Sequence, residues 1–172
     1  VYVASDVDLS NVKVAKIAKK VYNGKAIKPA VKLTYKGEAL KAGTDYTVAY
    51  KNNVKVGKAT VTITGKGDYV GSVKTSFVIA PAKAQIAKIK GKKKAIAVTI
   101  KNQKGTGVAG YQIAYKKAGA KKFKTVKTTN AKKTIKKLVK NKKYTVKVRA
   151  YAKIGGKTYY GAYSKAKTVK TY

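Results

Sequence analysis

Lysine is the residue type that gives this chain its greatest capacity for chemistry. The 172 residues include 42 Lys and Arg but only five Asp and Glu, with no His and no Cys, so the formal net charge is +37. All of the basic residues except Arg149 are lysines. Ammonium groups at this density attract polyanions at long range. The composition therefore predicts electrostatic binding and leaves the identity of the anion open.

The positive charge is concentrated in the second half of the chain. The acids all precede residue 70, at Asp6, Asp8, Glu38, Asp45 and Asp68. Residues 82–172 carry a net charge of +28 and residues 1–81 a net charge of +9.

Adjacent lysines recur through residues 82–172 with no acid between them. They are Lys92, Lys93 and Lys94; Lys116 and Lys117; Lys121 and Lys122; Lys132 and Lys133; Lys136 and Lys137; and Lys142 and Lys143. We interpret these runs as a polyanion-binding surface; the alternative is a solvated surface that only resists aggregation. Lys is a point charge and lacks the bidentate fork of Arg, so we expect a diffuse attraction. Candidate anions are wall teichoic acid, anionic glycans, extracellular nucleic acid and anionic lipid headgroups.

Catalytic and metal-binding chemistry lacks its usual residues. General acids and bases are most often His, Glu or Asp, and nucleophile pairs with His cannot form here. Asp6 and Asp8 are the only closely spaced carboxylates, and we expect them to lie in a solvated lead-in segment, residues 1–11. The sequence therefore predicts no enzyme activity, no metal site and no cofactor.

Tyr159, Tyr160 and Tyr163 form a second candidate site. Exposed aromatic rings stack on sugar rings or bases, which would suit a glycan-binding or host-adhesion module. The alternative, which we favour, is that these rings pack the last hairpin against a sheet.

Alternating apolar and polar residues predict an all-β chain. In the first half the pattern covers residues 12–14, 31–35, 46–50, 59–63 and 72–79. It stops at Ala80-Pro81-Ala82, where we place a domain boundary. It resumes over residues 96–100, 111–115, 123–126, 134–135 and 144–151, with a last strand over about 162–170. We therefore expect two tandem β-sandwiches, residues 12–80 and 82–172, with Ile96, Val98, Ile100, Ile113, Tyr144, Val146 and Val148 inside the second.

Residues 12–80 resemble the small Ig-like repeats of secreted and surface proteins of Gram-positive bacteria. The matching segments are YNGKAIKP at 22–29, GTDYTV at 43–48, NNVKVG at 52–57 and ATVTITGKGDYVG at 59–71.

Residues 82–172 resemble a fibronectin type III domain of the same surface proteins. The marks are GYQI at 110–113, Leu138 six residues ahead of Tyr144, and VKVRAY at 146–151. The resemblance implies that the Tyr144 hydroxyl bonds to backbone just upstream. The chain has no Trp, and Ile100 takes the place of the tryptophan usual on the second strand, so we expect a smaller core.

Together these features predict a non-catalytic accessory module that spaces or retains a larger protein at an anionic surface. The resemblance implies a secreted or cell-wall location, and the absence of Met predicts that the chain is a piece of a longer one. No apolar run approaches the length of a membrane span. Glycan binding and extracellular nucleic-acid binding remain the alternatives.

Overall fold

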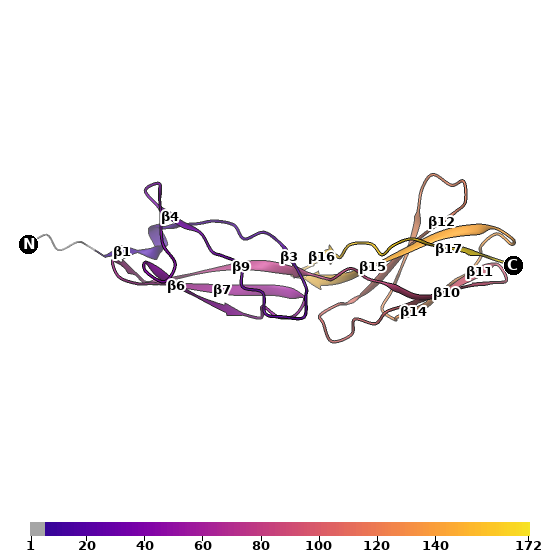
Figure 1. Ribbon diagram of the computed structural model, residues 1–172, viewed down its shortest axis with the longest axis horizontal. Helices are drawn as coiled ribbons and strands as arrows, with labels where there is room; N and C mark the ends of the chain where they lie inside the picture. The colour runs from indigo at the N-terminus through magenta and orange to yellow at the C-terminus, as the bar shows by residue number, and fades with distance from the viewer. Residues whose placement is uncertain (1–5) are drawn as a thin grey trace, which may run out of the picture. The chain divides into compact units, whose positions relative to one another are not determined.

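The structure, a computed structural model, describes residues 6–172, and their regular elements are almost entirely β-strands (Figure 1). The chain divides into two compact units. The first comprises the described residues up to Lys20 together with Gly24–Ile79, and the second comprises Val21–Asn23 and Ala80–Tyr172. The all-β prediction is therefore confirmed.

The first unit is built on a three-stranded and a four-stranded sheet, with a further parallel pair of short strands. The three-stranded sheet contains β2 (Lys13–Val14), β4 (Leu33–Tyr35) and β5 (Glu38–Ala39) in that order. The four-stranded sheet has the order β3 (Lys20–Val21), β9 (Ser72–Ala80), β7 (Gly57–Gly65) and β6 (Tyr46–Lys51). Alternation along β7 buries Ala59, Val61 and Ile63 completely, which explains why this segment could be recognised from its pattern.

Two tyrosine hydroxyls tie the irregular segment before β4 to β6. Tyr46 Oη donates to the Val31 carbonyl at 2.7 Å, and Tyr50 Oη donates to the Pro29 carbonyl at 2.5 Å. Burial raises the pKa of both Tyr46 and Tyr50, because it penalises the phenolate form.

The prediction that residues 1–11 form a solvated lead-in segment is wrong for residues 7–11. β1 (Val7–Asp8) pairs in parallel with β8 (Tyr69–Val70), and a 3-10 helix follows at Leu9–Asn11. Leu9 is completely buried, so this segment is part of the first unit. Asp6 is exposed, as expected, and Asp8 accepts a hydrogen bond from the Ser10 N–H at 2.7 Å. The part of this prediction that concerns residues 1–5 lies outside the described residues.

The second unit is a sandwich of two antiparallel sheets. One has the order β10 (Ile86–Lys92), β11 (Ala95–Ile100) and β14 (Lys132–Ile135). The other has the order β13 (Lys124–Thr128), β12 (Gly110–Lys117), β15 (Lys143–Ile154) and β16 (Lys157–Tyr160), and β17 (Lys167–Lys170) also pairs with β15.

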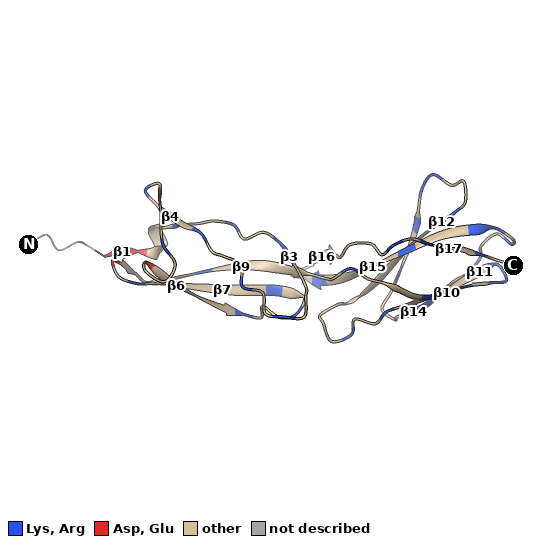
Figure 2. Ribbon diagram, in the orientation of Figure 1, with Lys and Arg blue, Asp and Glu red and all other residues tan. Residues whose placement is uncertain are grey.

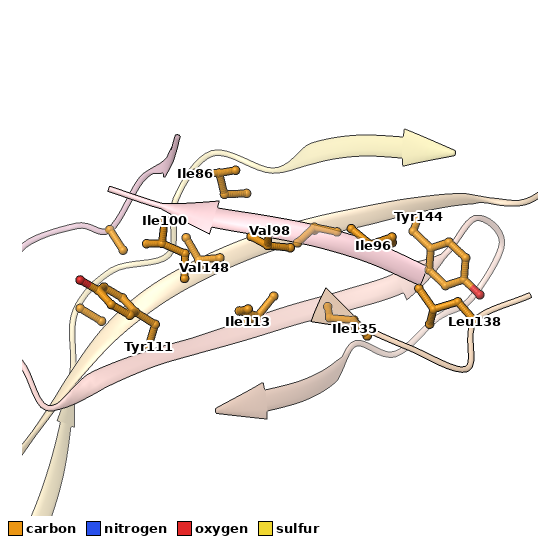
Figure 3. Close-up of a cluster of buried hydrophobic side chains, with 13 residues drawn as sticks. Ile86, Ile96, Val98, Ile100, Tyr111, Ile113, Ile135, Leu138, Tyr144 and Val148 are labelled. Atoms are coloured by element: carbon orange, nitrogen blue, oxygen red, sulfur yellow. The ribbon is translucent and has the colours of Figure 1, made fainter. Parts of the chain in front are cut away.

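All seven residues expected inside the second unit belong to its core (Figure 3). Ile100, at the position expected for the family's tryptophan, is 2% exposed and packs there with Val148 and Tyr111 among the buried residues. The predicted tyrosine contact is also present: the Val139 N–H donates to Tyr144 Oη at 3.0 Å. This part-buried hydrogen bond ties the backbone just upstream to the strand that carries Tyr144.

The end of the chain differs from its prediction. Only Lys167–Lys170 of the expected 162–170 strand is regular, and β10 and β16 were not predicted. Beyond β17 the chain reaches the opposite sheet: the Tyr172 N–H donates to the Lys92 carbonyl at 3.2 Å, and the Lys94 N–H donates to the Tyr172 carbonyl at 2.9 Å. A Cβ at Gly91 would collide with the Lys170 carbonyl, so glycine is what permits this close approach.

Candidate anion-binding surface

Five of the six lysine runs meet at one end of the second unit. They occupy the β10–β11 turn (Lys92, Lys93 and Lys94), the end of β12 (Lys116 and Lys117), the β12–β13 turn (Lys121 and Lys122), the segment after β14 (Lys136 and Lys137) and the start of β15 (Lys142 and Lys143). Figure 2 shows blue segments around these turns, near the C-terminus.

Backbone hydrogen bonds hold these turns together. The Leu138 N–H donates to the Lys94 carbonyl at 2.9 Å, which joins the segment after β14 to the β10–β11 turn. The Ala118 N–H donates to the Lys143 carbonyl at 2.8 Å, which joins the β12–β13 turn to β15. Segments separated by tens of residues in the sequence are therefore adjacent in space.

Lys132 and Lys133 lie apart from this group. They belong to β14 and pair with Thr99 and Val98 of β11, in the body of the three-stranded sheet. β14 is an edge strand of that sheet, where lysine discourages pairing with another chain. This pair therefore has a structural explanation that the other five runs do not share.

Hydrogen bonds to the buried, neutral Thr171 side chain hold the backbone of the lysine-rich end in place. Thr171 is 1% exposed, and its hydroxyl donates to the Val139 carbonyl at 2.6 Å and accepts from the Lys142 N–H at 3.2 Å. With the Tyr144 contact, this fixes the loop from Leu138 to Lys142 at both ends. No acid occurs in the second unit, so none of its side chains neutralises these lysines.

Two of the three tyrosine candidates, Tyr160 and Tyr163, pack around Arg149. The Arg149 guanidinium carbon lies 3.8 Å from the ring centroid of Tyr160 and 4.5 Å from that of Tyr163. Gln112 Oε1 accepts from Arg149 Nε at 2.7 Å and from the Tyr163 hydroxyl at 3.1 Å. The guanidinium therefore covers one face of each ring, as expected for cation–π packing.

This stack continues along the sheet. Lys147 Nζ lies 4.5 Å from the ring centroids of both Tyr163 and Phe123. Lys127 Nζ lies 5.6 Å from the Tyr160 centroid. Cations and rings thus alternate over the outer face of the sheet; we call this the cation–aromatic stack. It supports the packing role for Tyr160 and Tyr163. Tyr159, half-buried on β16, has no place in the stack among the contacts described.

The sequence contained one signal for this stack that we missed. Lys147 and Arg149 have odd numbers on β15, whereas the core residues Val146 and Val148 have even numbers, so both cations had to face outward. Their partners Tyr160 and Tyr163 come from beyond the next turn, and no local pattern pairs them with Arg149.

Residues 6–172 contain no cluster of three or more His, Cys, Asp or Glu side chains suited to a metal ion. No helix among these residues is long and apolar enough to cross a membrane.

Comparison with known proteins gives only distant structural neighbours. No family model and no curated protein sequence matches the chain. A solved structure described as "Myokine structure" is 18% identical, over 53% of this chain and 97% of its own, with a TM-score of 0.46. The chicken CNTN1 FN1–FN3 domains are 22% identical, over 66% of this chain and 42% of their own, with a TM-score of 0.48. A group of titin domains is 11% identical, over 93% of this chain and 66% of its own, with a TM-score of 0.43.

These structural neighbours are fibronectin type III or Ig-like proteins. Their TM-scores are all below 0.5, so no argument rests on them, and the β-sandwich of the second unit follows from its own sheets and core. The bacterial origin that the sequence motifs imply stays a prediction.

Proposed function

We propose that this chain is a non-catalytic accessory module of a secreted or surface protein, which it spaces or retains at an anionic surface. The partner is a cell-surface polyanion such as teichoic acid. The motifs of the Ig-like repeat and the fibronectin type III domain support the extracellular or cell-wall location.

One observation carries this proposal: five separate lysine runs converge on one end of the second unit. A surface that only kept the protein soluble would not need its charges gathered at one end, and mixed charges would serve it as well. Gathered ammonium groups instead raise the local concentration of polyanions and speed their association.

The alternatives have less support. A glycan-stacking site needs free ring faces, and Arg149 covers one face of both Tyr160 and Tyr163, which leaves their other faces and the half-buried Tyr159. Nucleic acid would be attracted through its phosphates, but stacking of its bases meets the same obstacle.

The test measures binding of the whole chain to purified wall teichoic acid as a function of NaCl concentration. If several phosphates are neutralised by lysines, affinity should fall by about 10³-fold or more between about 50 and 200 mM salt, through counterion release. A neutral cell-wall glycan is the control and should not bind. Absence of binding at low salt, or an affinity that salt leaves unchanged, would refute the proposal.

A further inference from the structure

The lysine-rich end contains a pocket of about 410 Å³. It lies between the β12–β13 turn and the segment that follows β14. Its lysines are Lys116, Lys117, Lys122, Lys124, Lys136 and Lys137. Tyr115, Leu138, Val139 and Tyr144 are among its other lining residues. Three of the sequence runs therefore face one shared space.

The wall of this pocket is fixed by the fold. Tyr144 is 5% exposed, and its hydroxyl holds the Val139 N–H at 3.0 Å. Lys137, two residues before Val139, has a backbone φ of +58°, which lies in the left-handed region that glycine adopts more readily than lysine. A lysine at this backbone position supplies a charge to the pocket where glycine would suit the turn better.

We propose that this pocket binds a phosphodiester chain without bases, in which short carbon segments separate the phosphates. This inference rests on the proposed function and makes it more specific: within the diffuse field, the pocket is a preferred docking point. The six lysines that line the pocket can bind phosphate groups as point charges. Leu138 and Val139 offer aliphatic surface to the carbon segments, and Val139 is 49% exposed.

The aromatic residues of the pocket disfavour nucleic acid. The Tyr144 ring is part of the core, and Tyr115 packs against that core. Phe123, at the nearby turn, has Lys147 Nζ 4.5 Å and Lys116 Nζ 5.0 Å from its centroid. The core and the ammonium groups thus take up part of the surface of these rings, which leaves less of it for the base stacking that usually supplies affinity for single strands.

The test compares two variants that each remove two positive charges. In K136Q/K137Q both substituted lysines line the pocket; in K132Q/K133Q, the matched control, neither does. The probe is poly(glycerol phosphate) of defined length, titrated into the whole chain at about 0.15 M NaCl. We expect K136Q/K137Q to lose about tenfold or more in affinity and the control to lose less than about threefold.

A second pocket variant distinguishes the loss of pocket charges from misfolding. K122Q/K124Q removes two lysines from the opposite wall and should give the same loss as K136Q/K137Q, with unfolding midpoints checked for all variants. Equal losses for the pocket variants and the control would overturn the pocket but leave the diffuse attraction intact. No binding by the unmodified chain at low salt would overturn both.

A base-bearing probe tests the ligand class. Oligothymidylate with the same number of phosphates should bind more weakly than poly(glycerol phosphate) and should distinguish less between K136Q/K137Q and K132Q/K133Q. If it bound more tightly, with the full difference between the two variants, the pocket would be a nucleic-acid site and the proposed ligand class would be wrong.

Discussion

The two units of the chain close their turns with different kinds of oxygen atom. In the first unit Asp8 accepts from the Ser10 N–H at 2.7 Å, and Asp45 accepts from the Lys41 N–H at 2.6 Å. In the second unit the acceptors are neutral: the Asn102 amide accepts from the Lys104 N–H at 3.0 Å, and the Thr171 hydroxyl accepts from the Lys142 N–H. A carboxylate that closes a turn also cancels one positive charge, whereas an amide or a hydroxyl does not.

This comparison explains how one chain maintains such unequal charge. Both units bury alternate residues of their long strands, since Val61 and Ile63 of β7 are as fully enclosed as Val146 and Val148 of β15. Charge and core are therefore independent of each other. The second unit reaches +28 because even its structural acceptors are uncharged.

We expect Gly91→Ala to produce the largest difference in stability between the two units. The new Cβ would collide with the Lys170 carbonyl and force β10 away from the end of β17. We expect a loss of about 3 kcal/mol in the second unit, at the upper end of overpacking costs, with no change in the first. Peptide-resolved hydrogen exchange would measure both units separately. Lys90→Ala, an exposed change on the same strand, is the control, and equal destabilisation of both units would contradict the expectation.

A smaller effect is expected from Tyr144→Phe, which leaves the Val139 N–H without its acceptor. We expect it to cost about 1–3 kcal/mol in the second unit. The counterpart in the first unit is Tyr46→Phe, which removes a donor from the Val31 carbonyl. Tyr46→Phe should cost at least as much, since its hydroxyl bond is buried whereas that of Tyr144 is only part-buried. Chemical denaturation of both variants would measure the difference, and an unchanged midpoint for Tyr144→Phe would show that its hydroxyl is dispensable.

The smallest effect concerns pH and only the first unit. The hydrogen bonds from Ser10 to Asp8 lower the pKa of the Asp8 carboxyl. Its contribution to stability is therefore complete above its unfolded pKa, about 4, and is lost as the pH falls through the lower folded value. Asp8→Asn keeps an acceptor without a titrating group, so the first unit of this variant should lose less stability between pH 5 and 2. Thermal unfolding over this range would measure the change; an unaltered pH dependence would exclude Asp8 as a contributor.

The residues that the sequence placed in the core of the second unit lie on β11, β12 and β15, and all of them are buried. Burial alternates over Ile96–Ile100 of β11 and from Tyr144 to Ala150 of β15, as the sequence predicted, whereas Gly110 to Ala114 of β12 are all buried. β10 escaped recognition because its register shifts between Ile86 and Lys88. The bulge sets Ile86 and Ile89 three residues apart, which breaks the period of two that marks a strand.

The arrangement of the lysines could not be predicted in the same way. Each run is visible in the sequence, but their convergence depends on hydrogen bonds such as that from Leu138 to Lys94, which join segments more than forty residues apart. Nothing local distinguishes Lys136 and Lys137, in the pocket, from Lys132 and Lys133, on an edge strand. Likewise, the stacking of Arg149 between Tyr160 and Tyr163 depends on the path of the chain after β16.

The gathering of lysines into turns at one end also determines where the folded chain is open to proteolysis. Proteases that cleave after lysine need an exposed, adaptable backbone, which turns provide and paired strands do not. Lys93, Lys121 and Lys142 are all exposed in or beside such turns, whereas Lys147 and Arg149 are half-buried within β15. A polyanion bound over the lysine-rich end would cover these same bonds, so occupancy of the surface and resistance of the second unit to such proteases would be coupled.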